Sequence, residues 1–425
     1  MKEKLGLREL IAIAIGSMIG GGIFSVIGVA DSISGHATPF VFVMGGIIAA
    51  FAGYNYSKLA LLFREDGASY TYLKAAFPKY PFIAGLVGWS VIIGYIGTLA
   101  LYAYTFGAYS AAVLDFENSY TVRTILALGI LALFLYINLR GVKAAGESED
   151  LLVYIKVFIM FLMGTAGVFF IQKSHFTPLF DKGYTNVFLS GAIVFVAYEG
   201  FQLVTNSVKE SINPQKDIKR AIFISIAVVT LIYIVLAVTV LGILTPQQIK
   251  ASKEYAVAEA LKPIFGQYGF VLASIAAMFA TSSAINGTMF GASRMMADIA
   301  KDRVFPQVFA KMDKKLIPQN ALFFMFLISS LFIVFGHLDA IVSFSSMTFL
   351  IVSLCVAVAN LKFYKSTNSN IFIIISSIIF MSITISLMIF YLYNHQPKTL
   401  YDIACVYITV VLTFIIYHLI KKGYR

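Results

Sequence analysis

The sequence predicts an all-α membrane protein of twelve transmembrane helices, with two of the helices interrupted near mid-span. The first observation is composition: 59% of the 425 residues are hydrophobic and 12% are charged, about half the charged fraction of a soluble domain. The second is that apolar residues form repeated runs of about 20 or more, the length that crosses the hydrocarbon core of a bilayer. The third is a pair of helix-breaking stretches, each in the middle of such a run.

Short polar loops separate the apolar runs and set the predicted boundaries. The twelve spans are predicted at residues 7–33, 38–63, 80–114, 119–139, 151–172, 185–208, 219–244, 264–296, 319–336, 339–361, 371–393 and 399–420. The third and eighth runs exceed a perpendicular crossing, so we expect them to tilt or to continue into a loop helix. No linker divides the chain, and residues 1–425 are therefore interpreted as a single transmembrane domain.

The basic residues are unevenly distributed over the loops. With the amino terminus in the cytoplasm, 24 Lys and Arg fall on the cytoplasmic side and 7 on the other, and the last of the 32 is Lys156 within a span. Because cytoplasmic loops carry the excess of Lys and Arg, we expect a multi-pass protein of the cell membrane with both termini in the cytoplasm. The net charge of +11 is scattered over many loops, which favours contact with the lipid bilayer and argues against nucleic-acid binding.

The number of helices suggests two groups of five, at 7–172 and 185–361, followed by two extra helices at 371–420. Because five is an odd number, the second group crosses the membrane in the opposite sense to the first. Two such groups can form an inverted repeat about an axis in the membrane plane. Since this repeat is internal, we expect no obligate protein partner.

Helix breakers fall in the first helix of each group. The candidate binding residues are Gly16, Ser17, Met18, Gly20, Gly21, Gly22 and Ile23 in helix 1, and Phe195, Val196, Ala197, Tyr198, Glu199 and Gly200 in helix 6. Unwound backbone is tolerated at membrane depth only where it lines a cavity or is buried in protein. The alternative for the glycines is close helix packing, but three adjacent glycines cannot share one helix face. We therefore predict a central substrate site at two unwound segments.

An unwound first helix would offer partners for both ends of an α-amino acid. The half-helix after the break would present the N–H groups of residues 21–23 and a positive dipole end to a carboxylate. Carbonyl groups freed before this break and at residues 195–197 would accept from an ammonium group. Ser17 would add a hydroxyl, whereas Phe195 and Tyr198 either wall the pocket or simply pack.

Two ionisable residues lie deep in apolar runs, where a charge costs about 2.5–3.5 kcal/mol on insertion scales and suggests function. Lys156 either snorkels to the nearby membrane boundary or points inward as a proton carrier. Its ammonium could also occupy a position in which sodium would otherwise bind freed carbonyls. Glu199 either takes part in the site, or is neutral, or caps the broken helix.

Four motifs in this order resemble the amino acid–polyamine–organocation superfamily of transporters, which share the LeuT-type fold. They are the glycine-rich run at 15–24, the FVAYEGF stretch at 195–201, the E-x-x-NP-x-K-x-I loop at 210–218 and the connection at 291–306. The resemblance is strongest to proton-coupled prokaryotic amino-acid transporters. It implies the 5+5 inverted repeat, secondary active transport by alternating access, a proton as coupling ion, no cofactor and no metal.

The resemblance also implies roles for individual residues. It implies that the glycine run binds the substrate carboxylate and that the helix 6 break binds the amine. It places Lys156 where its ammonium reaches the carbonyl of Gly16 in place of sodium, beside the hydroxyls of Ser282 and Ser283. A serine pair in a span is otherwise usually a packing feature.

Three alternatives stay open. The first is an amino-acid exchanger, or a polyamine or cationic amino-acid transporter of the same fold, in which Glu199 contacts a cationic substrate. The second is a channel, for which no ring of repeated polar residues is visible. The third is an intramembrane enzyme, but the five histidines are far apart and none pairs with carboxylates at metal-ligand spacing. We therefore expect a transporter and not an enzyme.

Overall fold

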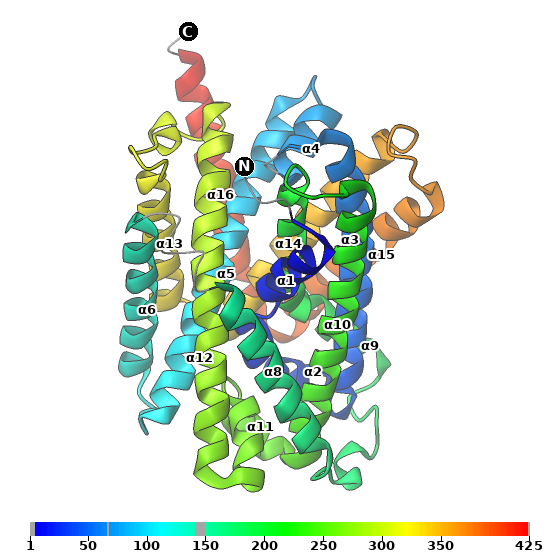
Figure 1. The fold of residues 1–425 in the computed structure, drawn as a ribbon, viewed down its shortest axis with the longest axis vertical. Helices are drawn as coiled ribbons and strands as arrows, with labels where there is room; N and C mark the ends of the chain where they lie inside the picture. The colour runs from blue at the N-terminus through cyan, green and yellow to red at the C-terminus, as the bar shows by residue number, and fades with distance from the viewer. Residues whose placement is uncertain (1–4, 66–67, 141–148, 424–425) are drawn as a thin grey trace.

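The computed structural model describes residues 5–65, 68–140 and 149–423, and these residues form helices and no strand (Figure 1). Both chain ends lie toward one end of the helix bundle, and the short helix α11 (Pro246–Ala251) lies at the other end. We name these two ends the terminal face and the α11 face. The all-α prediction is confirmed for the described residues.

Nine segments of the described chain are long and apolar enough to cross a bilayer. They are Gly21–Phe63, Pro81–Val113, Tyr120–Arg140, Tyr184–Ser207, Pro214–Ile243, Ala256–Lys301, Leu338–Lys362, Ile371–His395 and Pro397–Leu419. Shorter apolar helices lie at Lys156–Val168 and Gln319–Phe335. A multi-span membrane protein is thus confirmed, whereas the count of twelve crossings and the inverted repeat stay predictions.

Helices lie over each of the twelve predicted stretches. Their bounds are α1 Leu7–Met18, α2 Gly21–Ser34, α3 Thr38–Phe63, α5 Pro81–Val113, α6 Tyr120–Arg140, α8 Glu149–Val168, α9 Tyr184–Ile193, α10 Pro214–Ile243, α12 Ala256–Lys301, α13 Gln319–Phe335, α14 Leu338–Lys362, α15 Ile371–His395 and α16 Pro397–Gly423. A further helix, α4 (Ala68–Ala76), lies between α3 and α5. Proline stands in the first turn of α3, α5 and α10, where a missing N–H costs no intrahelical hydrogen bond.

The helix predicted at 264–296 is wrong in its bounds. The structure continues α12 from Ala256 to Lys301, with one non-helical residue, Gly266, at φ 60° and ψ −153°. The polar residues Glu259 and Lys262 in the first turns of α12 interrupt the apolar run. An apolar pattern therefore detects the membrane-embedded part of this helix but not its ends.

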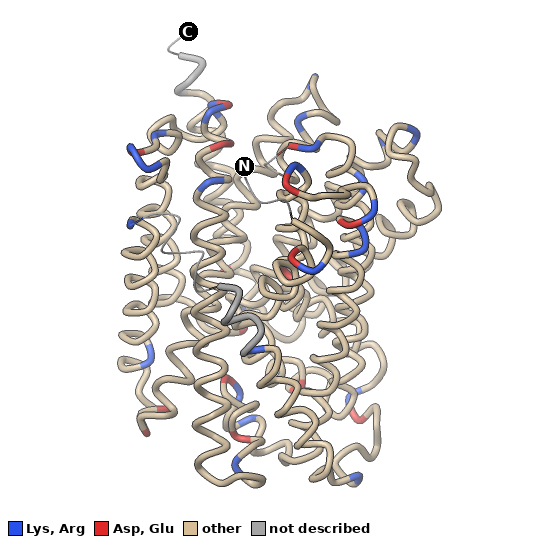
Figure 2. The backbone as a smooth tube through the Cα atoms, in the orientation of Figure 1, with Lys and Arg blue, Asp and Glu red and all other residues tan. Residues whose placement is uncertain are grey.

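The long helix α5 packs against α12, α14 and α6, while α10 packs against α1 and α3. Charged residues gather toward the two ends of the bundle, and the band between them is mostly uncharged (Figure 2). This arrangement suits a protein whose middle is surrounded by hydrocarbon. It also makes each charged group inside the band conspicuous.

A candidate substrate site at two interrupted helices

The first helix is interrupted between α1 and α2. Ile19 (ψ 79°) and Gly20 (φ −114°, ψ −151°) leave helical geometry, and a Cβ on Gly20 would lie 2.7 Å from the Cβ of Ala284 on α12. A side chain at position 20 would therefore force the helices apart. The predicted interruption is present, and α2 begins at Gly21, where the second half-helix was predicted to begin.

The sixth predicted helix is interrupted at Glu199 and Gly200. The α-helix α9 tightens into the 3₁₀-helix η3 (Val194–Tyr198), Glu199 turns to ψ 134°, and a second 3₁₀-helix, η4 (Phe201–Ser207), follows. Gly200 has φ 127°, a backbone conformation that favours glycine. Its position also requires glycine, since a Cβ there would lie 2.6 Å from the carbonyl carbon of Ser17.

The two interruptions lie side by side, with α1 packed against η4 and α2 against η3. Tyr233 of α10 joins them, because its hydroxyl lies 2.9 Å from the carbonyl oxygen of Met18 and 2.8 Å from that of Ala197. A hydroxyl has one proton, so the two carbonyls share this donor. Tyr233 is fully buried and holds both interruptions at one point.

Lys156 points inward and does not snorkel. Its side chain is 1% exposed, and its Nζ donates to the carbonyl oxygens of Gly16 at 2.6 Å and Ile19 at 2.7 Å. In a continuous helix the Gly16 carbonyl would accept from the N–H of Gly20, but that N–H bonds to Met18 instead. The lysine therefore supplies a donor that the interruption removed.

A small cavity lies beside the interruptions. Its lining residues are Gly16, Ser17, Tyr95, Thr98, Tyr102, Glu199, Gly200, Leu203, Ser283, Ala284, Gly287 and Thr288. The structure thus brings together Gly16, Ser17, Glu199 and Gly200 of the predicted binding residues, with Ser283 of the predicted coupling pair. Ser282 is half-buried and does not line this cavity. Glu199 is bonded by the side-chain amide of Gln202.

Other predicted binding residues are buried in packing and do not line the cavity. This group comprises Met18, Gly20, Gly21, Gly22, Ile23, Phe195, Val196, Ala197 and Tyr198. Tyr102 is one reason why Gly20 and Gly21 do not line the cavity. Its ring and backbone lie about 3 Å from the positions of Cβ atoms built on these two glycines. The hydroxyl of Tyr198 donates to the carbonyl of Phe42. In this conformation the start of α2 is covered by α5.

Sequence reasoning missed the contribution of α5. Tyr95, Thr98 and Tyr102 are spaced by three and four residues, so they share one face of the helix. A polar stripe within an otherwise apolar span was the signal that could have identified them. Tyr233 carried no comparable signal, because it is a single tyrosine in an apolar run.

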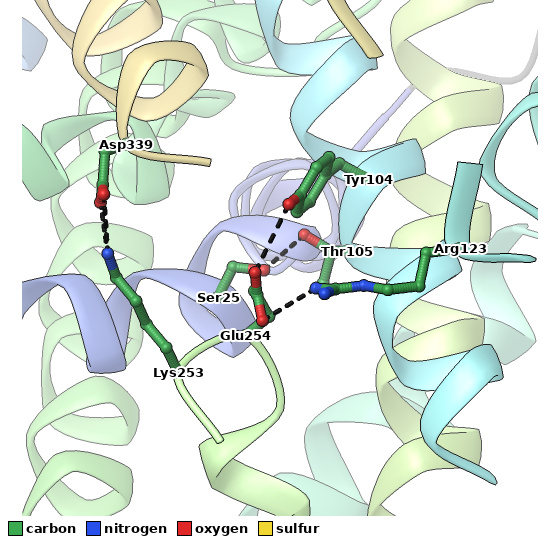
Figure 3. Close-up of polar contacts among 7 residues, drawn as sticks. All are labelled: Ser25, Tyr104, Thr105, Arg123, Lys253, Glu254 and Asp339. Carbon is green, nitrogen blue, oxygen red and sulfur yellow. Dashed lines mark hydrogen bonds and ion pairs between the residues drawn. The ribbon is translucent and has the colours of Figure 1, made fainter. Parts of the chain in front are cut away.

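The α11 face is fastened by two ion pairs from consecutive residues of the loop between α11 and α12 (Figure 3). Lys253 pairs with Asp339 of α14 at 2.7 Å. Glu254 pairs with Arg123 of α6 at 2.8 Å and accepts from the hydroxyl of Tyr104 of α5 at 3.4 Å. The backbone of Lys253 also lies against α2. We name this loop with its two ion pairs the α11-face latch.

Comparison with known proteins places the chain in a family. The model of the amino acid permease family matches residues 5–416. An uncharacterized protein of Methanocaldococcus jannaschii is 30% identical, with 99% of this chain and 96% of that protein covered. The inner membrane transport protein YbaT of Escherichia coli is 30% identical, with 94% and 92% covered. The branched-chain amino acid permease BcaP of Bacillus subtilis is 24% identical, with 74% and 70% covered.

These matches confirm the resemblance to the amino acid–polyamine–organocation superfamily and indicate a transporter, not an enzyme. They extend over nearly the whole chain, including both interruptions and the helices that surround them. The chain belongs to the amino acid permease family of membrane transporters.

Proposed function

We propose that the chain carries amino acids across the cell membrane by alternating access, in symport with protons and without sodium. The two termini lie in the cytoplasm in this proposal. The substrate binds beside the two interruptions, with its carboxylate at the start of α2 and its amine near the carbonyls of residues 195–197. Because Tyr102 covers the start of α2, substrate binding requires the ring of Tyr102 to move aside.

Lys156 is the observation that carries the proposal. Its ammonium already fills the place where a free cation would bind the carbonyls of Gly16 and Ile19. Hydrogen bonds from a charged donor are about twice as strong as those from a neutral one. Protonation of Lys156 therefore tightens α8 against the first interruption, and loss of the proton loosens it. This difference links a proton to the shape of the substrate site.

Alternating access also requires each face to close in turn. The α11-face latch supports this part of the proposal, since it fastens one loop to α5 and α6 on one side and to α14 on the other. These helices belong to different halves of the predicted repeat. Opening of the α11 face then requires at least one of the two ion pairs to separate.

Uptake into proteoliposomes tests the proposal. Purified protein is reconstituted, an inward proton gradient is imposed in sodium-free buffer, and the accumulation of labelled amino acids is measured. We expect concentrative uptake that a protonophore abolishes. Uptake that depends on sodium and ignores the pH gradient would refute proton coupling, and failure to carry any amino acid would refute the transport of amino acids.

A second candidate is exchange or uptake of cationic amino acids or polyamines. It is favoured by Glu199, whose carboxyl group lines the cavity and is bonded by the neutral side chain of Gln202. Counterflow into vesicles loaded with lysine, arginine or putrescine distinguishes this candidate. Counterflow of these cations together with no uptake of neutral amino acids would replace the first proposal.

A further inference from the structure

The central cavity is lined by several hydroxyl groups. Six of its twelve lining residues carry a hydroxyl group, namely Ser17, Tyr95, Thr98, Tyr102, Ser283 and Thr288. Leu203 is the one large aliphatic side chain among them. These hydroxyl groups suit a small ligand with polar groups of its own.

Ser283 differs from the other hydroxyl groups of its helix. Ser274, Thr281 and Ser293 each donate to a carbonyl oxygen of the preceding turn of α12. The Oγ of Ser283 is buried and has no hydrogen-bond partner among the described residues. The Ser283 residue as a whole is 4% exposed and lines the cavity.

Two other wall hydroxyls already donate to backbone carbonyls. Ser17 donates to Ile13 at 2.7 Å, and Thr98 donates to Tyr95 at 2.9 Å. Buried polar groups in folded proteins are nearly always hydrogen-bonded, so an unpartnered one requires an explanation. Because Ser283 faces the cavity, a bound ligand can supply the missing partner.

We propose that Ser283 determines substrate specificity by bonding a hydroxyl group on the side chain of a small amino acid. The inference rests on the proposed function and names its substrate class. The two interruptions supply N–H and carbonyl groups for the carboxylate and amine that every amino acid shares. Ser283 belongs to a third element of the cavity, α12, and we assign its hydroxyl to the part of the substrate that varies.

Threonine and valine provide a matched pair of substrates. Their side chains have nearly the same shape, but one carries a hydroxyl where the other carries a methyl group. A site with a waiting hydrogen-bond partner discriminates against the analogue that lacks the group, because its own polar atom stays unpaired. One hydrogen bond corresponds to a preference of about tenfold in kcat/KM.

The test measures initial uptake of threonine and of valine by the full chain in proteoliposomes under a pH gradient. We expect the wild-type protein to favour threonine by about tenfold and the variant Ser283→Ala to lower this ratio to about one. The change is expected in the KM for threonine, with the maximal rates unaltered. Since both substrates are measured on the same preparation, the ratio does not depend on how much of the variant is folded.

The variant Ser274→Ala is the matched control. It removes a buried hydroxyl from the same helix, but this hydroxyl donates within α12 and lies outside the cavity lining. We expect it to keep the wild-type ratio. A wild-type protein that carries valine as well as threonine would overturn the substrate class without any variant.

If Ser283→Ala lowered the uptake of threonine and of valine equally, Ser283 would contact the carboxylate or amine that all amino acids share. This result would overturn the inference. Uptake of no amino acid at all would instead count against the proposed function. These outcomes separate a failure of the inference from a failure of the function on which it rests.

Discussion

Replacement of Lys156 by methionine tests the internal ammonium most directly. Methionine has a similar length but no charge and no donor, so the carbonyls of Gly16 and Ile19 lose the bonds that the lysine makes. A hydrogen bond involving a charged group contributes about 1.5–3 kcal/mol, which gives about 3–6 kcal/mol for two. The cost of burying the ammonium offsets part of this gain.

A net effect of about 3 kcal/mol corresponds to a change of about 100-fold in the population that keeps the first interruption in its observed shape. We expect Lys156→Met to reduce pH-driven uptake in proteoliposomes by about that factor. The remaining uptake should no longer respond to the direction of the pH gradient. Initial rates at several gradients measure both effects.

Lys182 offers a control with similar geometry in a different environment. Its Nζ donates to the carbonyl oxygens of Asp31 at 2.9 Å and Ser32 at 3.1 Å, but its side chain is exposed. Exposed substitutions usually change stability by about 0.5 kcal/mol or less, so Lys182→Met should keep uptake within about twofold of wild type. If Lys156→Met also kept pH-driven uptake near the wild-type rate, the role given to the ammonium would be wrong.

Three further predictions concern other contacts. Tyr233→Phe removes the donor that joins the two interruptions and should cost about 1 kcal/mol, measured as a rise in the KM for substrate. Lys253→Asp and Asp339→Lys should each lower the thermal stability of the purified protein by up to about 1 kcal/mol, and the double exchange should restore it. Backbone N–H groups of Ile317 and its neighbours hold the pKa of Asp313 below its ordinary value. The resulting stabilisation is present above the unfolded pKa and lost as pH falls through the folded pKa, so the protection factor of this loop in hydrogen exchange, corrected for the intrinsic exchange rate, should fall at acidic pH.

Each of these predictions has a matched control. Tyr109→Phe removes an equally buried hydroxyl that bonds a single carbonyl, and an equal rise in KM there would contradict the role of Tyr233. The exposed Lys301–Asp298 pair within α12 should tolerate the same charge exchange, and a double exchange at the latch that fails to restore stability would argue against a direct ion pair. Asp313→Asn should abolish the pH dependence of this protection factor.

The two interruptions could be predicted because they are local features of the sequence. Adjacent glycines at 20–22 and the pair Glu199–Gly200 each disturb an otherwise regular apolar run. Lys156 stood out for a similar reason, as an isolated charge within a span. Such signals need only the neighbouring residues, and the structure places all of these features close together.

Features that depend on packing between distant helices could not be predicted in the same way. Tyr233 is one of 24 tyrosines, and only the fold brings its hydroxyl to Met18 and Ala197. The carboxylate site stays a prediction, and Tyr102 from a separate helix covers the start of α2, where it was predicted, in this conformation. Local sequence identifies where the backbone is freed, whereas the fold decides which side chains reach it.

The lysine at the first interruption bears a cationic group that is attached to the chain itself. A soluble ion would bind there according to its concentration in the medium, but a covalently attached group has a fixed effective concentration. Dilution of the surroundings therefore cannot empty this position, and competing salts have little opportunity to displace it. We therefore expect the first interruption to keep its shape at low and at high salt concentration while Lys156 is protonated.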